Sequence, residues 1–208
     1  MLADQHSSWL QRRSIWATAC LLGAAGLLCA VAFSPWHFFP VLFCSFSLLL
    51  VALSVARGLG QAFAFGWVFG TGYFAGGLYW LEHSFVVADL GSGAGFVAVA
   101  LLSATLGLWV GVACLLGKLS QLTGVKLCAA FATLWTLAEW ARGTVPLGGF
   151  PWNLVGYTWA FSDELIQIAS LVGVFGLSGW TIFVAALPGS LIVGSASRLQ
   201  ASAWARAV

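Results

Sequence analysis

Charged side chains are scarce in this chain of 208 residues. Asp, Glu, Lys and Arg make up 7% of the sequence, whereas soluble globular domains carry about 25% charged residues. Because a soluble fold needs those charges to cover its surface, the composition excludes an ordinary soluble domain. The apolar runs also lack strict alternation with polar residues, so segments that span a membrane are predicted to be helices.

Metal-binding patterns are missing as well. The five cysteines have no CxxC spacing, and no His or acid stands beside them to complete a metal site. Each lies inside an apolar run and is interpreted as a small buried apolar side chain. No metal and no cofactor is therefore predicted. The cysteines are Cys20, Cys29, Cys44, Cys114 and Cys128.

Apolar residues are abundant, at 61% of the chain, and they gather in long runs. Since a spanning helix needs about 20 mostly apolar residues, the runs predict an all-α, polytopic transmembrane helical bundle of about six spans. The bundle is expected to cover residues 15–194, between cytoplasmic segments at 1–14 and 195–208. The predicted spans are 15–33, 38–55, 62–81, 94–117, 125–143 and 165–193.

The basic residues predict the orientation of the bundle, because cytoplasmic loops are enriched in Lys and Arg. With both termini in the cytoplasm, Arg142 is the one basic residue that falls outside. The net charge of +2 follows from this topology and indicates no nucleic-acid partner. The basic residues predicted inside are Arg12, Arg13, Arg57, Lys118, Lys126, Arg198 and Arg206. The acids predicted outside are Glu82, Asp89, Glu139, Asp163 and Glu164.

The first run allows a second interpretation. Arg12 and Arg13, an apolar stretch and the triplet Ala30-Val31-Ala32 resemble a secretory signal with its cleavage site. The apolar stretch is longer than the usual run of about 7–15 residues, and further spans follow. A membrane span is therefore favoured.

Small residues at fixed spacing indicate where helices pack. Pairs of glycines four apart in the third run, and glycines three apart in the last, permit close helix contact. They predict that the third and sixth spans lie at helix contacts. A proline in the last run, Pro188, predicts a kink or an end of that helix. The glycines are Gly66, Gly70, Gly72 and Gly76, then Gly173, Gly176 and Gly179.

The block Glu139–Tyr157, EWARGTVPLGGFPWNLVGY, concentrates rare residue types at the end of an apolar run. Glu139 and Arg142 share a helix face at positions i and i+3 and can pair. Two interpretations stay open. In the first, the pair only makes the burial of the two charges tolerable. In the second, Arg142 also binds a lipid phosphate, for which the guanidinium fork is well shaped.

Phe150, Pro151, Trp152 and Asn153 follow in a stretch rich in turn-forming residues. Aromatic side chains at this depth normally anchor a protein at the membrane interface. An anchor does not need so ordered a turn, so a half-buried loop lining a lipid-accessible cavity is the functional alternative.

The end of the third run, GGLYWLEHS (Gly76–Ser84), places Trp80, Glu82 and His83 on the same predicted side as Glu139. A Glu–His pair can do acid–base chemistry, but adjacent residues on a helix point apart. A cap at the membrane interface is favoured over catalysis. No nucleophile with a neighbouring base is visible in the sequence, and no catalytic residue is predicted.

Five sequence blocks stand in order over most of the chain. They are AFSPW (Ala32–Trp36), GWVFGTGYFAGGLYWL (Gly66–Leu81), EWARG (Glu139–Gly143), GGFPWNLVGY (Gly148–Tyr157) and QIASLVGVFGLSGW (Gln167–Trp180). In this order they resemble the apolipoprotein N-acyltransferases of bacterial inner membranes. The resemblance implies a multi-pass helical bundle that presents membrane lipid to a periplasmic nitrilase-like domain carrying a Glu–Lys–Cys triad.

The resemblance also implies the reaction and its partners. A membrane phospholipid donates an acyl chain to the cysteine, which passes it to the N-terminal amine of a diacylglyceryl-cysteine lipoprotein. No lysine or cysteine of this chain matches the triad, so the chain is expected to be the membrane half, to stop before the catalytic domain and to be inactive alone. The positions carried over for substrate access are Trp80, Glu139, Arg142, Phe150, Pro151, Trp152 and Asn153.

Two other functions compete with the membrane half of an acyltransferase. The first is a non-enzymatic membrane module that binds lipid or a partner. The second is a small transporter, which is disfavoured because no acid or base falls near the midplane of a predicted span, where coupling sites usually lie.

Overall fold

The protein is an all-α bundle, as predicted. The computed structural model describes the backbone of residues 2–145 and 149–205 and the side chains of residues 15–145 and 149–194, and no strand occurs in these ranges. The α-helices are α1 (Leu2–Leu28), α2 (Val41–Val55), α3 (Leu59–Gly77), α4 (Leu81–Val87), α5 (Ser92–Leu119), α6 (Gly124–Thr144), α7 (Asp163–Ile166) and α8 (Ala169–Ala205). Two 3-10 helices, η1 (Cys29–Ala32) and η2 (Val155–Trp159), lie between them.

A helix occupies each of the predicted spans, namely α1, α2, α3, α5, α6 and α8. Within the part of the chain that the structure describes, three segments are long and apolar enough to cross a membrane by length and composition: Ile15–Ala32, Ser92–Leu119 and Ala169–Gly194. Helix α2 is apolar but shorter. The number of spans and their orientation therefore stay predictions.

Two predicted boundaries need correction. The third span was expected to reach Leu81, but α3 ends at Gly77 and α4 begins separately at Leu81. The last span was expected to begin at Leu165, but that residue lies in α7, whose N-cap Ser162 accepts a hydrogen bond from the Leu165 N–H at 3.3 Å. Local capping and the adjacent glycines Gly76 and Gly77 break runs that look continuous by hydropathy.

Aromatic packing forms the centre of the bundle. The indole of Trp135 on α6 meets four other rings edge-on, with centroids 5.1 Å from Phe46, 5.6 Å from Tyr73, 5.9 Å from Phe131 and 6.3 Å from Phe69. All five residues are fully buried. Because lipid is as apolar as these side chains, dispersion contacts at close range hold such helices together rather than a hydrophobic driving force.

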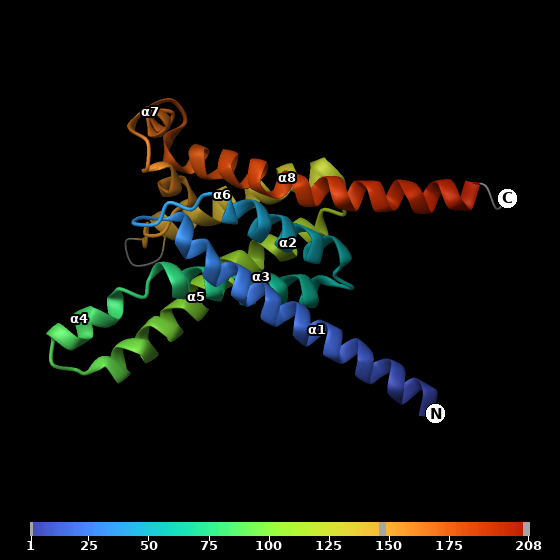
Figure 1. Cartoon of the computed structure of the whole chain (residues 1–208), viewed down its shortest axis with the longest axis horizontal. Coiled ribbons are helices and arrows are strands. Elements are labelled where there is room, and N and C mark those ends of the chain that lie inside the picture. The colour runs from blue at the N-terminus through green and yellow to red at the C-terminus, as the bar shows by residue number, and fades with distance from the viewer. Residues whose placement is uncertain (1, 146–148, 206–208) are drawn as a thin grey trace.

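The glycines of α3 lie at helix contacts, as the spacing predicts. A Cβ on Gly66 would meet the Cys114 side chain at 2.7 Å, and one on Gly70 would meet Val110 at 2.8 Å, both on α5. Gly72 and Gly76 instead approach the backbone of α1. Helix α3 is consequently packed between α1 and α5, with which it makes its most extensive contacts (Figure 1).

The glycines of α8 behave differently from one another. Gly179 faces α6, where a Cβ would meet the Thr136 hydroxyl at 2.5 Å. Gly176 meets only Val172 of its own helix. The sixth span lies at helix contacts as predicted, because α8 packs against α2 and α6. Gly173 has φ 69° and therefore interrupts the regular helical backbone of α8. Glycine adopts a positive φ without strain.

Pro188 does not end α8, which continues to Ala205. Beside this proline, the Ser47 hydroxyl of α2 donates a hydrogen bond to the Ala185 carbonyl at 3.0 Å. The same hydroxyl accepts one from the Gly189 N–H, also at 3.0 Å. A regular helix would join Ala185 and Gly189 directly, and insertion of a side chain at such a point is an established cause of bending.

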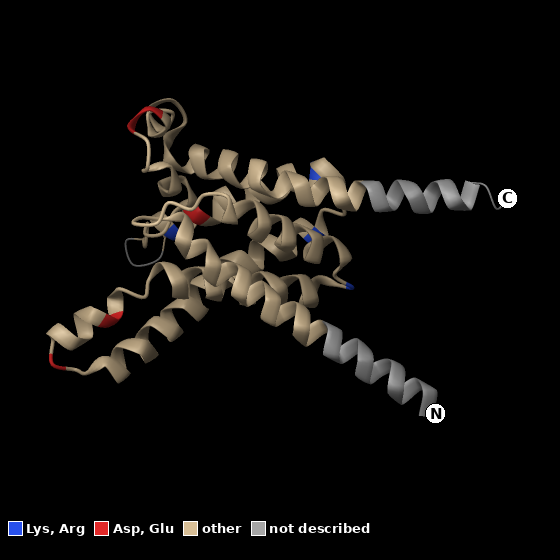
Figure 2. Cartoon of the chain, viewed as in Figure 1, with Lys and Arg blue, Asp and Glu red and all other residues tan. Residues whose placement is uncertain are grey.

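The charges separate along the bundle. Figure 2 shows Asp and Glu at the end where α4 and α7 lie, and most Lys and Arg of the described residues towards the opposite end. At the acidic end, α4 and the first turns of α5 project from the bundle as an arm (Figure 1). Helix α4 packs chiefly against α5.

Candidate functional site

The last turns of α6 carry a buried acid and a buried base. Glu139 is 4% exposed and Arg142 is 2% exposed. Burying a charge is costly unless hydrogen bonds satisfy it, so the partners of these two side chains decide what the site can do. Both side chains reach to the segment that follows α6, which includes the FPWN loop (residues 149–154).

Glu139 links its own helix, α6, to the start of η2. Its Oε1 atom accepts hydrogen bonds from Trp135 Nε1 at 3.0 Å and from the Val155 N–H at 2.9 Å. The next N–H, of Gly156, donates to Ser178 Oγ on α8 at 2.7 Å. Two consecutive backbone donors of η2 are therefore satisfied by side chains from two different helices.

Arg142 holds the FPWN loop through its carbonyls. The guanidinium Nη1 donates to Phe150 O and to Trp152 O, the latter at 2.8 Å. In return, the Phe150 N–H donates to the backbone carbonyl of Arg142 at 2.8 Å. The guanidinium carbon lies 5.0 Å from the centre of the Phe74 ring, within the range of a cation–π contact.

The direct pair predicted between Glu139 and Arg142 is not formed. No carboxylate oxygen of Glu139 lies within 4.0 Å of a guanidinium nitrogen of Arg142. Helical spacing permits the pair, but the loop's buried carbonyls and N–H groups need partners, and each side chain turns to them. Arg142 is buried in the conformation it adopts, and its contact with a lipid phosphate stays a prediction.

Asn153 fastens the loop to α3. It adopts a positive φ of 58°, which Asn tolerates better than most residues. Its carbonyl accepts a hydrogen bond from the Tyr73 hydroxyl at 2.9 Å, and its Nδ2 atom donates to Tyr73 O at 3.4 Å. The carboxamide also packs directly on Gly77, where any side chain would collide with it.

An exposed tryptophan pair covers the junction of α3 and the loop. The rings of Trp80 and Trp152 lie 5.5 Å apart between centroids, and the residues are 43% and 55% exposed. Trp80 Nε1 donates to Gly77 O at 3.1 Å. Pro151 is exposed beside them, whereas Phe150 packs against the core. The surface of the site is thus aromatic and uncharged.

Glu82 and His83 lie apart from this network. Both belong to α4, where His83 is exposed and Glu82 is half-buried against the close approach of Gly95 on α5. Neither contributes to the hydrogen bonds that hold the FPWN loop. Within residues 15–145 and 149–194, no group of three His, Cys, Asp or Glu side chains is placed to hold a metal ion.

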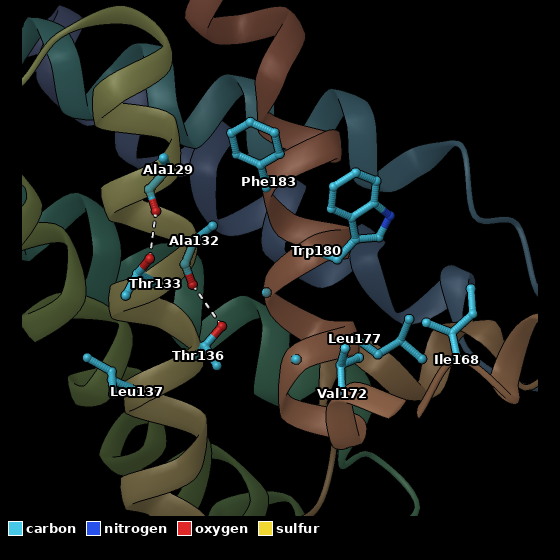
Figure 3. Close-up of a pocket in the computed structure, with 12 residues that line it drawn as sticks. Ala129, Ala132, Thr133, Thr136, Leu137, Ile168, Val172, Leu177, Trp180 and Phe183 are labelled. Carbon is cyan, nitrogen blue, oxygen red and sulfur yellow. Dashed lines mark hydrogen bonds between the residues drawn. The ribbon is translucent and has the colours of Figure 1, made fainter. Parts of the chain in front are cut away.

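An apolar groove of about 740 Å³ lies between α6 and α8 (Figure 3). Its polar wall residues have their hydroxyl hydrogens occupied, because Thr133 donates to Ala129 O at 3.0 Å and Thr136 to Ala132 O at 2.9 Å. Trp180 and Phe183 of α8 form much of the opposite wall. The groove suits hydrocarbon and not a polar ligand.

Several residues that complete the site were not predicted from the sequence. Tyr73, Trp135 and Ser178 sit inside apolar helical runs and look like packing residues. The scarcity of polar groups was the available signal: Tyr73 is one of only three tyrosines in the chain. Which polar group faces the loop depends on tertiary contacts.

Fold and site together define a helical membrane protein that holds an aromatic loop with a buried acid and a buried base. Residues 25–187 match the model of the apolipoprotein N-acyltransferase N-terminal domain. The chain is 39% identical over 186 residues to the apolipoprotein N-acyltransferase of Allorhizobium ampelinum, covering 85% of this chain and 35% of that protein. It is 35% identical over 167 residues to that of Rickettsia prowazekii, covering 79% of this chain and 32% of that protein.

The chain belongs to the apolipoprotein N-acyltransferase family, which confirms the resemblance of the five sequence blocks. It matches the N-terminal domain of that family and spans about one third of the length of these relatives.

Proposed function

We propose that this chain is the membrane region of an apolipoprotein N-acyltransferase that receives the phospholipid acyl donor. The observation that carries the proposal is the FPWN loop, which Arg142 and Tyr73 brace from two helices while Trp152 stays exposed. Glu139 holds the η2 turn directly after it. A braced backbone under exposed aromatic side chains suits a surface that must keep its shape while lipid moves past it.

The apolar groove supports the same proposal. It begins along α6 at Leu137, within one turn of Glu139, and continues inward to Ala129. Eight helical positions correspond to a length of about 12 Å, enough for part of an acyl chain. A phospholipid whose head lies near Trp80 and Trp152 would place hydrocarbon at this depth. Glu139 and Arg142 then act as positioning residues, and the exposed residues of the loop meet the lipid.

The complete reaction is proposed from the family. The acyl chain would pass from phospholipid to the N-terminal amine of a diacylglyceryl-cysteine lipoprotein at the periplasmic face of the inner membrane. The competing function, a non-enzymatic module that binds lipid or a partner, predicts lipid contact without any effect on acyl transfer.

Photo-crosslinking tests the lipid contact. The chain in nanodiscs would be irradiated with a phospholipid that carries a diazirine in its acyl chain, and crosslinked peptides of α6 and α8 would be mapped by mass spectrometry. Thr133→Trp fills the groove and should suppress crosslinks to Trp180 and Phe183. The matched control is Thr105→Trp on α5, because that threonine is also exposed and bonds its own helix at 2.8 Å.

A chimaera tests the link to catalysis. Residues 25–187 would replace the matched domain of the Allorhizobium ampelinum relative, and acyl transfer would be measured in membranes. Trp152→Ala in an active chimaera should lower the rate of acyl transfer. An unchanged rate would refute the role of Trp152. A chimaera that forms the crosslinks but has no acyl transfer would favour the non-enzymatic module.

A further inference from the structure

Two polar atoms of the buried acid and base have no hydrogen-bond partner among the described residues. They are Glu139 Oε2 and Arg142 Nη2. Their sister atoms, Oε1 and Nη1, each make two hydrogen bonds. A charged group that is buried with an unsatisfied atom is strongly destabilising, so a native fold rarely retains two of them side by side.

Both side chains line one small cavity of about 10 Å³ in the bundle. The remaining walls are the side chains of Phe74, Trp109, Val110, Trp135 and Ala138. A volume of about 10–15 Å³ on this measure holds a single water molecule. The cavity therefore has room for about one water molecule, and the two residues that carry the unsatisfied atoms both belong to its wall.

The charges of the walls restrict what can occupy this space. An anion would face the carboxylate of Glu139, and a metal cation would face the guanidinium of Arg142. An ammonium ion donates hydrogen bonds but accepts none, so it cannot satisfy Arg142 Nη2. The occupant must be neutral, no larger than one heavy atom, and able both to accept from an N–H and to donate to a carboxylate.

We propose that this cavity is a binding site for one ordered water molecule, which accepts a hydrogen bond from Arg142 Nη2 and donates one to Glu139 Oε2. The water joins an acid and a base that do not touch. It thereby connects two sets of backbone bonds: those from Arg142 to Phe150 and Trp152, and that from Val155 to Glu139. The proposal rests on the cavity and its unsatisfied atoms, and it is independent of the proposed function.

Water-edited solid-state NMR tests the site on the chain in lipid bilayers, with ¹⁵N-arginine and ¹³C-glutamate labels. Magnetisation that starts on water should reach Arg142 Nη and Glu139 Cδ at short mixing times, although both residues are buried. The signals are assigned by their loss in Arg142→Lys and Glu139→Gln. Absence of transfer to either group in the unsubstituted protein would overturn the proposal.

A pair of alanine substitutions locates the water. Ala138 lines the cavity, so Ala138→Val places two methyl carbons in it and should reduce the transfer to the noise level. Ala141→Val is the matched control, because Ala141 is a half-buried alanine of the same helix outside the cavity wall, and it should leave the transfer unchanged. Undiminished transfer in a folded Ala138→Val protein would contradict the site.

If Ala138→Val does not fold, a distance measurement on the unsubstituted protein tests the proposal instead. Dipolar recoupling between Glu139 Cδ and Arg142 Nη in the unsubstituted protein should give a separation that fits one bridging molecule. A separation that fits direct contact of the carboxylate and the guanidinium would leave no room for the water and would refute the proposal.

Discussion

The FPWN loop and the α4 arm both follow a long helix at the same end of the bundle, yet they are held in different ways. The backbone of the loop is bound by Tyr73 of α3 and Arg142 of α6, and the η2 turn that follows is bound by Ser178 of α8 through Gly156. The turn after α4 is held by local backbone bonds, such as Ala88 N–H to Ser84 O at 3.1 Å. Side chains from distant segments fix the loop, whereas the arm depends on its own turn and on α5.

The charged residues of the two regions also differ in their roles. Glu139 and Arg142 are buried and act on backbone groups, so their removal should disturb a large part of the bundle. Glu82 and His83 lie on the arm, outside that network, and their removal should be felt locally. Substitutions in the two regions therefore test the comparison directly.

The largest effect is expected for Arg142→Ala. The substitution removes the charged donor of Phe150 O and Trp152 O. A hydrogen bond to a charged group contributes about 1.5–3 kcal/mol, so the loss of two should cost about 3–6 kcal/mol. Unfolding of the chain in mixed micelles would measure the loss. A loss no greater than that of an exposed substitution would show that the loop does not depend on Arg142.

A smaller effect is expected for Tyr73→Phe, which deletes only the hydroxyl that donates to Asn153 O at 2.9 Å. One lost hydrogen bond with a buried acceptor should lower the free energy of unfolding by about 1 kcal/mol. Tyr79→Phe is the control, since Tyr79 is 57% exposed. Equal losses for the two tyrosines would contradict the role of Tyr73 as a clamp on the loop.

The smallest effect is expected for His83→Ala on the arm. Because His83 is exposed and outside the loop network, the change in unfolding free energy should stay within about 0.5 kcal/mol. The same variant also tests acid–base chemistry at Glu82 and His83, because a catalytic pair would lose activity without losing stability. An active chimaera that carries His83→Ala and loses acyl transfer would revive that interpretation.

Hydropathy predicted the long helices, because each apolar run is long enough to require one. It did not predict α4, η2 or α7, whose boundaries depend on local capping and on glycines inside apolar runs. The positions of Glu139 and Arg142 were found because charge is rare in the chain. Their partners were not. Trp135 stands four residues before Glu139 on one helix, a spacing that permits the bond, whereas the contact of Ser178 with Gly156 depends on how α8 packs. Helical spacing alone favoured a direct pair between Glu139 and Arg142. In the structure both side chains instead form hydrogen bonds to backbone groups of the segment that follows α6.

The Ser47 hydroxyl of α2, which bonds both Ala185 and Gly189, opposes sliding of α8 along α2. A shift of α8 by one residue moves it about 1.5 Å along its axis and takes both backbone groups out of reach of the hydroxyl. Gly189 also lies directly against the backbone of Ser47, where a Cβ would come within 2.5 Å of its carbonyl oxygen. Helix α2 therefore sets the axial register of α8, and with it the level at which Trp180 and Phe183 face α6.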